Sequence, residues 1–269
     1  MSRTLDHIRA GTYAFDNAGE ETRRRFVALP ALYDPSTKRH LRERGLGRGW
    51  NCLEIGAGNG SIAAWLAQQV APSGSVLATD IDTRFLDQLD LPCLTVQQHD
   101  IVNDPLPKGF FDLIHERLVL IHLPQRRAVL ERLIKALKPG GWLVIEDFDC
   151  SSLVADQDVD LVPDPPASII GLQAVLRARG CDLLYGRRGP WLLRRHGLVD
   201  VEAESRGLLC GGASFFASLM QANIEQVHDE LLATGVTQAT FDAEHARMSD
   251  PAEAFLTPVM WSTWGRRPS

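Results

Sequence analysis

Between residues 50 and 149 the chain alternates short apolar runs with stretches whose apolar residues recur at helical spacing. The pattern predicts strands that alternate with helices. The strands are expected at 50–56, 74–82, 93–101, 110–116 and 142–149, and the helices at 61–70, 83–90 and 124–141. Alternation of this kind predicts an α/β fold built on a mainly parallel sheet with helices on both faces.

The segments on either side of this region are less regular. We expect an N-terminal helical arm over 1–49 that can act as a lid. The remaining elements are expected as helices at 169–180, 189–198, 213–233 and 238–248, and as strands at 199–209 and 255–267. The prediction is therefore one domain over 50–269, with helical insertions at about 151–185 and 212–250 that cover a substrate.

Composition limits which ligands the chain can bind and which compartment it is expected in. The 269 residues carry a net charge of −6, which argues against nucleic acid as a ligand. The chain shows no run of 18 apolar residues and no leader-like apolar stretch at its start, so neither a membrane span nor a signal peptide is predicted. Five scattered cysteines without a C-x-x-C pair are typical of reduced thiols in a cytoplasmic protein, and no spacing of ligands predicts a metal site.

The first predicted strand runs into a turn with glycines at 56, 58 and 60, preceded by Glu54. A Walker loop would need a lysine after the last glycine, and the dinucleotide fingerprint would need that glycine one position later. The remaining pattern is E-x-G-x-G-x-G. Its acid would repel a pyrophosphate and attract a cationic ligand, such as one with a free ammonium group.

Acidic residues also end the other predicted strands. Asp80 lies twenty residues after Gly60, where a carboxylate can accept both hydroxyls of a ribose. Asp100 is followed by Ile101, a pair suited to the amino group and the flat face of an adenine. With Glu116, these acids would meet at the carboxyl edge of a parallel sheet, which is where such sheets bind ligands.

Five segments in order, LEIGAGNG, VLATDID, QHDIVNDPLP, FDLIHERLVLIHL and LKPGGWLVIED, resemble the motifs of class I S-adenosylmethionine-dependent methyltransferases. The likeness is to the small-molecule branch that includes enzymes of quinone and natural-product biosynthesis, and it is strong over about 50–150. It implies a Rossmann-like seven-stranded sheet of order 3-2-1-4-5-7-6 with strand 7 antiparallel. The predicted strands at 199–209 and 255–267 would be strands 6 and 7.

The resemblance also implies which residues contact S-adenosylmethionine. The glycine turn would pass close to the methionine part, and Glu54 would help to hold its ammonium group. Glu116 and Arg117 would run beside the same part. The positions implied are Glu54, Gly56, Gly58 and Gly60 for the methionine part, Asp80 for the ribose, Ile81, Asp100 and Ile101 for the adenine, and Glu116 with Arg117.

A methyl transfer needs a general base only when the acceptor carries a proton at working pH. The candidates are His115, His122 and Asp147, with Glu146 beside the last. The alternative for His122 is a structural histidine packed under the cofactor, because the family's LHHL-like element reads LIHL here. For Glu146 and Asp147 the alternative is a structural role as helix-capping or loop residues.

Other segments have open roles. Tyr13 or Phe15 in the arm could cover the methionine end, or the arm could pack on another subunit of a homo-oligomer. Arg187 or Arg188 could bind an acidic substrate group, with solvated helix faces as the ordinary alternative. Aromatic residues of the insertions suggest an apolar pocket, although core packing is the ordinary explanation for any single one: Trp191, Phe215, Phe216 and Trp261.

The expected function is methyl transfer from S-adenosylmethionine to an O, N or C nucleophile of a small molecule, as in natural-product biosynthesis. One alternative keeps the cofactor as a fixed positive charge that assists a cyclisation or elimination. Another is a binding protein without chemistry. An NAD-dependent oxidoreductase is disfavoured by the early third glycine and by Glu54.

Overall fold

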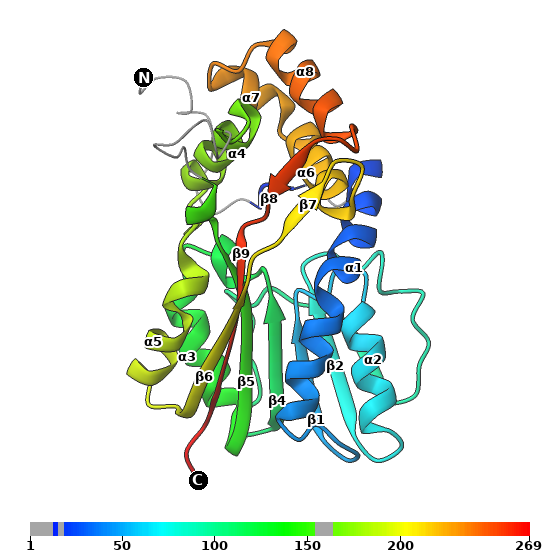
Figure 1. Cartoon of the computed structure of the whole chain (residues 1–269). Helices are drawn as coiled ribbons and strands as arrows, with labels where there is room; N and C mark the ends of the chain where they lie inside the picture. Colours follow the sequence, from blue (N-terminus) through cyan, green and yellow to red (C-terminus); the bar gives the residue numbers. More distant parts are fainter. Residues whose placement is uncertain (1–12, 16–18, 154–163) are drawn as a thin grey trace.

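The computed structural model describes residues 13–15, 19–153 and 164–269 (Figure 1). Its centre is a seven-stranded sheet of order β3-β2-β1-β4-β5-β9-β6. In that order the strands are β3 (Leu94–Gln98), β2 (Ser75–Asp80), β1 (Asn51–Ile55), β4 (Phe111–Arg117), β5 (Leu137–Asp149), β9 (Val259–Arg266) and β6 (Val199–Arg206). Strands β1 to β5 pair in parallel, and β9 runs antiparallel to both of its neighbours. The predicted order 3-2-1-4-5-7-6 is confirmed, with β9 as strand 7.

Helices cover both faces of this sheet, which explains why apolar side chains lie on both faces of the central strands. On one face, α3 (Arg126–Ala136) and α5 (Tyr185–Arg195) pack against side chains such as Leu53 and Ile114. On the other, α2 (Ser61–Val70) and the end of α1 (Glu20–Glu43) pack against Cys52, Leu113 and Val144.

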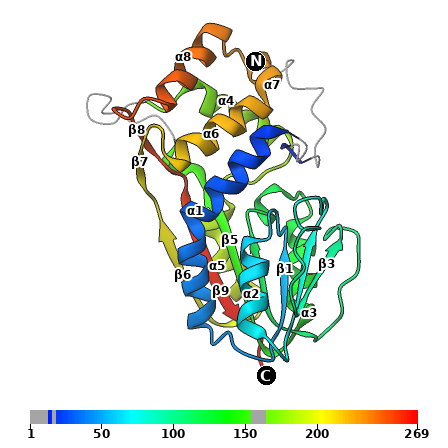
Figure 2. The same ribbon diagram turned by 90° about the vertical axis from the view of Figure 1, so that its right-hand side faces the viewer.

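A second layer sits beyond the carboxyl ends of the parallel strands (Figures 1 and 2). We call it the helical cap. It consists of α4 (Ala167–Ala178), α6 (Phe215–Gln226), α7 (His228–Ala233), α8 (Gln238–Met248) and the ribbon of β7 (Leu209–Gly211) with β8 (Ala254–Leu256). The cap has its own apolar cluster, to which the first half of α1 contributes Ala28. Helix α1 therefore runs from the cap down along the sheet, as Figure 2 shows.

Two predicted helices need correction. Residues 83–90 form turns rather than a helix, although Leu86 is fully buried and Phe85 packs against Phe26. The helix predicted at 124–141 ends at Ala136, and the Pro-Gly-Gly sequence after it belongs to β5. Gly140 takes a positive φ of 77° there, and the start of β5 pairs irregularly with β4.

The helix found in the N-terminal arm is shorter than the predicted arm over 1–49. Within the predicted arm, the described helix is α1, which begins at Glu20, ends at Glu43 and continues through Pro30 and Pro35. Residues 1–12 and 16–18 of the arm, and 154–163 of the first insertion, lie outside the described part of the chain. Within the described part, no helix has the length and apolar character needed to cross a membrane.

Candidate active site

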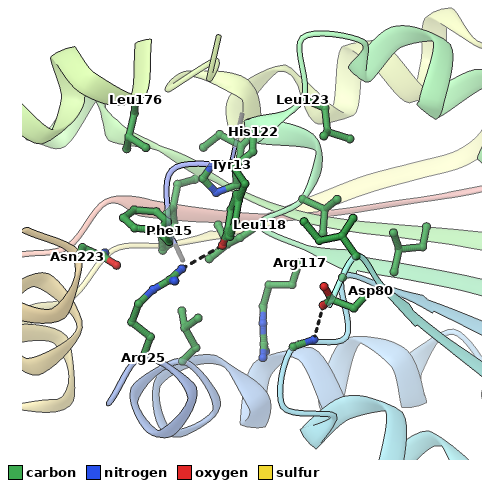
Figure 3. Close-up of a pocket in the computed structure, with 18 of the residues that line it drawn as sticks. Tyr13, Phe15, Arg25, Asp80, Arg117, Leu118, His122, Leu123, Leu176 and Asn223 are labelled. Atoms are coloured by element: carbon green, nitrogen blue, oxygen red, sulfur yellow. Dashed lines mark hydrogen bonds between the residues drawn. The ribbon is translucent and has the colours of Figure 1, made fainter. Parts of the chain in front are cut away.

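A cavity of about 460 Å³ lies between the carboxyl ends of the sheet and the helical cap (Figure 3). Its volume is within the range of small-molecule sites, about 300–1,000 Å³. The sheet contributes the loops after β1, β2, β3 and β4, and α1 contributes Arg25 and Phe26. Tyr13 and Phe15 line one side, and leucines of α4 and α6 form much of the cap side.

The glycine turn after β1 is shaped by its backbone. Gly56, Gly58 and Gly60 have φ values of 63°, 57° and 78°, in the left-handed region that glycine adopts without strain. A Cβ on Gly56 would lie 2.3 Å from Cγ2 of Val119, and one on Gly60 would lie 2.3 Å from Cδ1 of Leu89. Side chains are therefore excluded here by both conformation and space.

Asp80 is fixed beside this turn. Its Oδ2 accepts a hydrogen bond from the backbone N of Gly58 at 2.9 Å, and its Oδ1 accepts one from the N of Asp82 at 3.1 Å. Burial raises the pKa of Asp80 despite these hydrogen bonds. The carboxylate thus reaches the cavity from a fixed position, with further acceptor capacity for ligand hydroxyls.

Ile81, Asp100 and Ile101 line the cavity next to Asp80. The side chain of Ile81 is half exposed, which leaves an apolar face open to a ligand. Asp100 accepts hydrogen bonds from the backbone N of Val102 at 2.8 Å and from Nδ2 of Asn103 at 2.6 Å. This part of the cavity combines apolar side chains with a carboxylate.

Beneath the cavity, Glu54, His115 and Glu146 form a buried chain across β1, β4 and β5. The Nδ1 of His115 lies 2.7 Å from Glu54 Oε2, and its Nε2 lies 3.4 Å from Glu146 Oε2. Burial alone would lower the pKa of His115, but the two carboxylates outweigh it and raise that pKa to about 9. The imidazole is therefore an imidazolium held between two acids at neutral pH.

Helix α1 is anchored to this chain. Glu146 accepts hydrogen bonds from the hydroxyls of Thr37 and Ser262, and its Oε1 lies 3.2 Å from Nδ1 of His40. Burial works against the charge of Glu146, yet the hydrogen bonds with His115 and His40 hold its pKa well below the usual range. Arg117 extends the network by donating to Thr37 and, at 2.9 Å, to Asp34 of α1.

Glu116 and Asp147 form a second buried pair, on the opposite side of their strands. Glu116 Oε2 accepts hydrogen bonds from the backbone N of Val119 and Leu120, and Asp147 Oδ1 accepts one from the N of Ile121. Burial and the neighbouring Asp147 raise the pKa of Glu116 well above its usual value, and burial raises that of Asp147 to about 6. The hydrogen bonds of the pair fix the loop after β4.

His122 lies on that loop, in the short helix η1 (Leu120–His122), and lines the cavity. Its ring packs edge-on against Tyr13, with centroids 5.1 Å apart, and its Nδ1 lies 3.3 Å from Sγ of Cys181. Burial, followed by the charges of Arg25 and Arg126, lowers the pKa of His122 to about 3. The imidazole is neutral throughout the physiological pH range.

The cavity gathers most of the predicted binding residues. Those that line it are Glu54, Gly56, Gly58, Asp80, Ile81, Asp100, Ile101, Arg117 and His122. Those outside the lining are Gly60, Glu116, His115, Glu146 and Asp147. The last four are buried in the two networks just described, and Gly60 is the N-cap of α2.

The candidates from the insertions lie elsewhere. Arg187 pairs with Asp149 at 2.5 Å, and Arg188 pairs with Asp182. Neither lines the cavity, and the same holds for Trp191, Phe215, Phe216 and Trp261. The apolar lining comes instead from residues that sequence reasoning did not single out, among them Leu118, Leu172, Leu176, Leu219 and Met220. Arg25 was also missed, because it is the last of three consecutive arginines and such a run is typical of an exposed helix face.

Comparisons with known proteins give a consistent result. Residues 20–203 match the model of a family described as "Methyltransferase domain". The chain is 36% identical over 150 residues to methyltransferase str3 of Strobilurus tenacellus (55% of this chain, 52% of that protein), and 37% identical over 159 residues to str2 of the same organism (58% and 56%). The chain thus spans about half the length of the curated relatives it matches.

The fold is shared with solved structures. Phosphoethanolamine N-methyltransferase 2 of Haemonchus contortus, solved in complex with phosphomonomethylethanolamine and S-adenosylhomocysteine, superposes with a TM-score of 0.58. The sequence identity is 17%, and the match covers 93% of this chain and 59% of that protein. At this identity the similarity establishes the architecture of the sheet and its helices.

Proposed function

We propose that this chain, which belongs to the class I S-adenosylmethionine-dependent methyltransferases, transfers a methyl group from that cofactor to an oxygen, nitrogen or carbon nucleophile of a small molecule. The observation that carries the proposal is a single cavity joining the glycine turn after β1, Asp80 at the end of β2 and Asp100 after β3. These groups suit an adenosine that bears a cationic tail.

The residues present fit this cofactor. Asp80 is held by Gly58, and its carboxylate can accept the two hydroxyls of a ribose. Gly56 and Gly58 let the backbone approach the methionine part, since a side chain at either position would be strained. Ile81 and Ile101 would contact the adenine ring, and Asp100 its amino group.

Glu54 would balance the charge of the methionine ammonium group. It lines the cavity while its Oε2 is bonded to His115, so its orientation is fixed before any ligand arrives. Arg117 would run beside the same part of the cofactor, anchored by Asp34. Gly60 and Glu116 would act indirectly: Gly60 starts α2, and Glu116 holds the backbone of the loop after β4.

When bound, the cofactor supplies a methyl group that its sulfonium charge has already activated. The residues of this chain then need to orient the acceptor and exclude water. A neutral imidazole with a pKa of about 3 is a weak base, so we assign His122 a packing and orienting role toward the acceptor. We assign His115 and Asp147 positioning roles, because each is buried away from the cavity.

The acceptor itself would be a largely apolar small molecule. Leu172, Leu176, Leu219 and Met220 of the helical cap line the end of the cavity beyond the predicted cofactor site. We further propose that the reaction serves natural-product biosynthesis in the cytoplasm. The five free cysteines support a reducing compartment. In this proposal residues 1–49 form a lid that a second subunit can share, and 50–269 form the catalytic domain.

The test is an assay of S-adenosylhomocysteine formation with a panel of phenols, carboxylic acids, amines and enolisable ketones. Transfer to any member, with the methylated product identified by mass spectrometry, supports the proposal. Conversion of an acceptor without formation of S-adenosylhomocysteine would instead indicate a cyclisation or elimination. Tight cofactor binding with no conversion in a broad panel would favour a binding protein.

A further inference from the structure

One buried cation in the cavity has no counter-ion among the described residues. Arg25 is 6% exposed, and it projects from α1 into the cavity (Figure 3). Its Nη2 donates to the hydroxyl of Tyr13 at 3.1 Å, and its guanidinium lies 4.1 Å from the ring centroid of Phe15. Its Nε and Nη1 are buried and have no hydrogen-bond partner in the part of the chain that the structure describes.

Such an arrangement is unfavourable without an anion. A buried charge loses its hydration, and neither a phenol hydroxyl nor an aromatic ring neutralises it. Arg117, which also lines the cavity, shows how such a charge is usually neutralised, because it pairs with Asp34 at 2.9 Å. Tyr13 and Phe15 thus fix the orientation of Arg25 and leave its charge available to a ligand.

The position of Arg25 also suits a ligand that reaches from the glycine turn. The next residue, Phe26, packs so closely that its Cε1 lies 3.2 Å from a Cβ built on Gly58. Figure 3 shows Arg25 on the opposite side of the cavity from Asp80. An anionic group on Arg25 would therefore belong to the part of a ligand remote from the ribose site.

We propose that Arg25 binds a carboxylate inside the cavity. A guanidinium matches the planar geometry of a carboxylate and can donate two hydrogen bonds to it. The inference rests on the proposed function, which offers two sources of this group. One is the α-carboxylate of the cofactor's methionine part, and the other is an acid group of the acceptor.

Calorimetry with a pair of cofactor analogues tests the first source. Wild-type protein and Arg25→Gln are each titrated with S-adenosylhomocysteine and with its decarboxylated analogue. If Arg25 holds the cofactor's carboxylate, the substitution weakens binding of S-adenosylhomocysteine by about tenfold or more and leaves binding of the analogue nearly unchanged. Arg23→Gln is the matched control, since it removes the same charge from an exposed position of α1.

A second titration tests the acceptor as the source. Protein saturated with S-adenosylhomocysteine is titrated with benzoate and with the uncharged benzamide. If Arg25 holds an acceptor's acid, the wild type prefers benzoate by about tenfold or more, and Arg25→Gln removes that preference. The inference is overturned when Arg25→Gln changes neither the preference for S-adenosylhomocysteine over its decarboxylated analogue nor the preference for benzoate over benzamide. A wild type that binds no S-adenosylhomocysteine would overturn the proposed function first, and this inference with it.

The free protein offers a readout that needs no ligand. Because an unpaired buried cation is unfavourable, Arg25→Gln is expected to unfold at the same temperature as the wild type or higher. The measurement also shows that the variant is folded before the titrations. A clear fall in melting temperature would contradict the inference, since it would mean that the guanidinium is already satisfied within the protein.

Discussion

At the scale of single residues, the proposed site depends on carboxylates held in place by backbone N–H groups. Asp80 is the clearest case, with one oxygen bonded to Gly58 and the other to Asp82. The same turn would lose its shape with any side chain at Gly56 or Gly60. Sequence reasoning could locate these residues because the constraint is local, set by a strand end, a turn and the start of a helix.

Asp80→Ala is expected to weaken S-adenosylhomocysteine binding by about 1.5–3 kcal/mol, the usual contribution of hydrogen bonds to a charged group. Isothermal titration calorimetry measures the change. The control is Asp82→Ala, which removes a partly exposed carboxylate two residues away that lies outside the cavity lining and pairs with Arg84. Equal affinity of wild type and folded Asp80→Ala would refute the ribose assignment.

The environments of other side chains depend on long-range packing and could not be predicted from the sequence. His115 and Arg117 share one face of β4 with Leu113, and nothing local indicates that α1 covers this face. His115 therefore lies in a buried chain of acids, while His122, one loop later, reaches the cavity. Arg25 contributes to the cavity because α1 crosses from the cap to the sheet, and no sequence motif predicts this course of the helix.

At the scale of elements, α1 links the sheet to the cap. Its carboxyl half is tied to the sheet through Thr37 and His40, which bond Glu146 of β5. Its amino half packs on α6, where Arg24 pairs with Glu225. These contacts explain why the helix continues through Pro30 and Pro35, each of which removes a backbone hydrogen bond.

The buried acid–histidine–acid chain predicts a pH dependence of stability. The pKa of His115 rises from 6.5 to about 9 on folding, beside Glu54 and Glu146. The folded protein keeps this proton where the unfolded chain releases it, so the stabilisation is complete below pH 6.5 and is lost as pH rises toward 9. We expect the free energy of unfolding to fall by about 1–3 kcal/mol over this interval.

Urea denaturation at several pH values measures this slope. His115→Gln should show a shallower decline between neutral pH and pH 9, because its side chain does not titrate. His228→Gln is a suitable control, since that histidine is in the cap and packs against Phe241. Parallel slopes for wild type and His115→Gln would show that His115 does not carry a proton into this range.

The elements themselves were largely predictable from hydrophobic pattern. The five apolar runs of the first half became β1 to β5, and the two late ones became β6 and β9. Failures occurred where tertiary contacts decide the boundary. Gly140 and Gly141 suggested the end of a helix, but their backbone lies in β5, where a Cβ on Gly141 would lie 2.9 Å from the carbonyl oxygen of Phe111.

At the scale of the whole molecule, the cavity is shared by two apolar clusters. The sheet provides the loops that would hold the cofactor, and the helical cap provides the leucines that would enclose the acceptor. Helix α1 belongs to both parts, with Ala28 in the cap cluster and Leu41 in the sheet cluster. Unfolding of either part should therefore disturb the other.

We expect the described parts to unfold in a single transition that a ligand shifts as a unit. Fluorescence should report mainly on the sheet and the helices packed on it, where Trp65 of α2 and Trp264 of β9 are buried, whereas far-ultraviolet circular dichroism includes the cap helices. The two curves should coincide, and S-adenosylhomocysteine at a hundredfold excess over its dissociation constant should add about 2.7 kcal/mol of stability. Two separate transitions, of which the ligand moves one, would show that the cap folds independently.

The most direct test of cofactor identity is calorimetric titration of the purified protein with S-adenosylhomocysteine and, separately, with NAD. The glycine turn, Glu54 and Asp80 predict micromolar binding of S-adenosylhomocysteine and no measurable binding of NAD, whose pyrophosphate the buried acid would repel. Tight binding of NAD without a response to S-adenosylhomocysteine would contradict the proposed function and every cofactor contact assigned to this cavity.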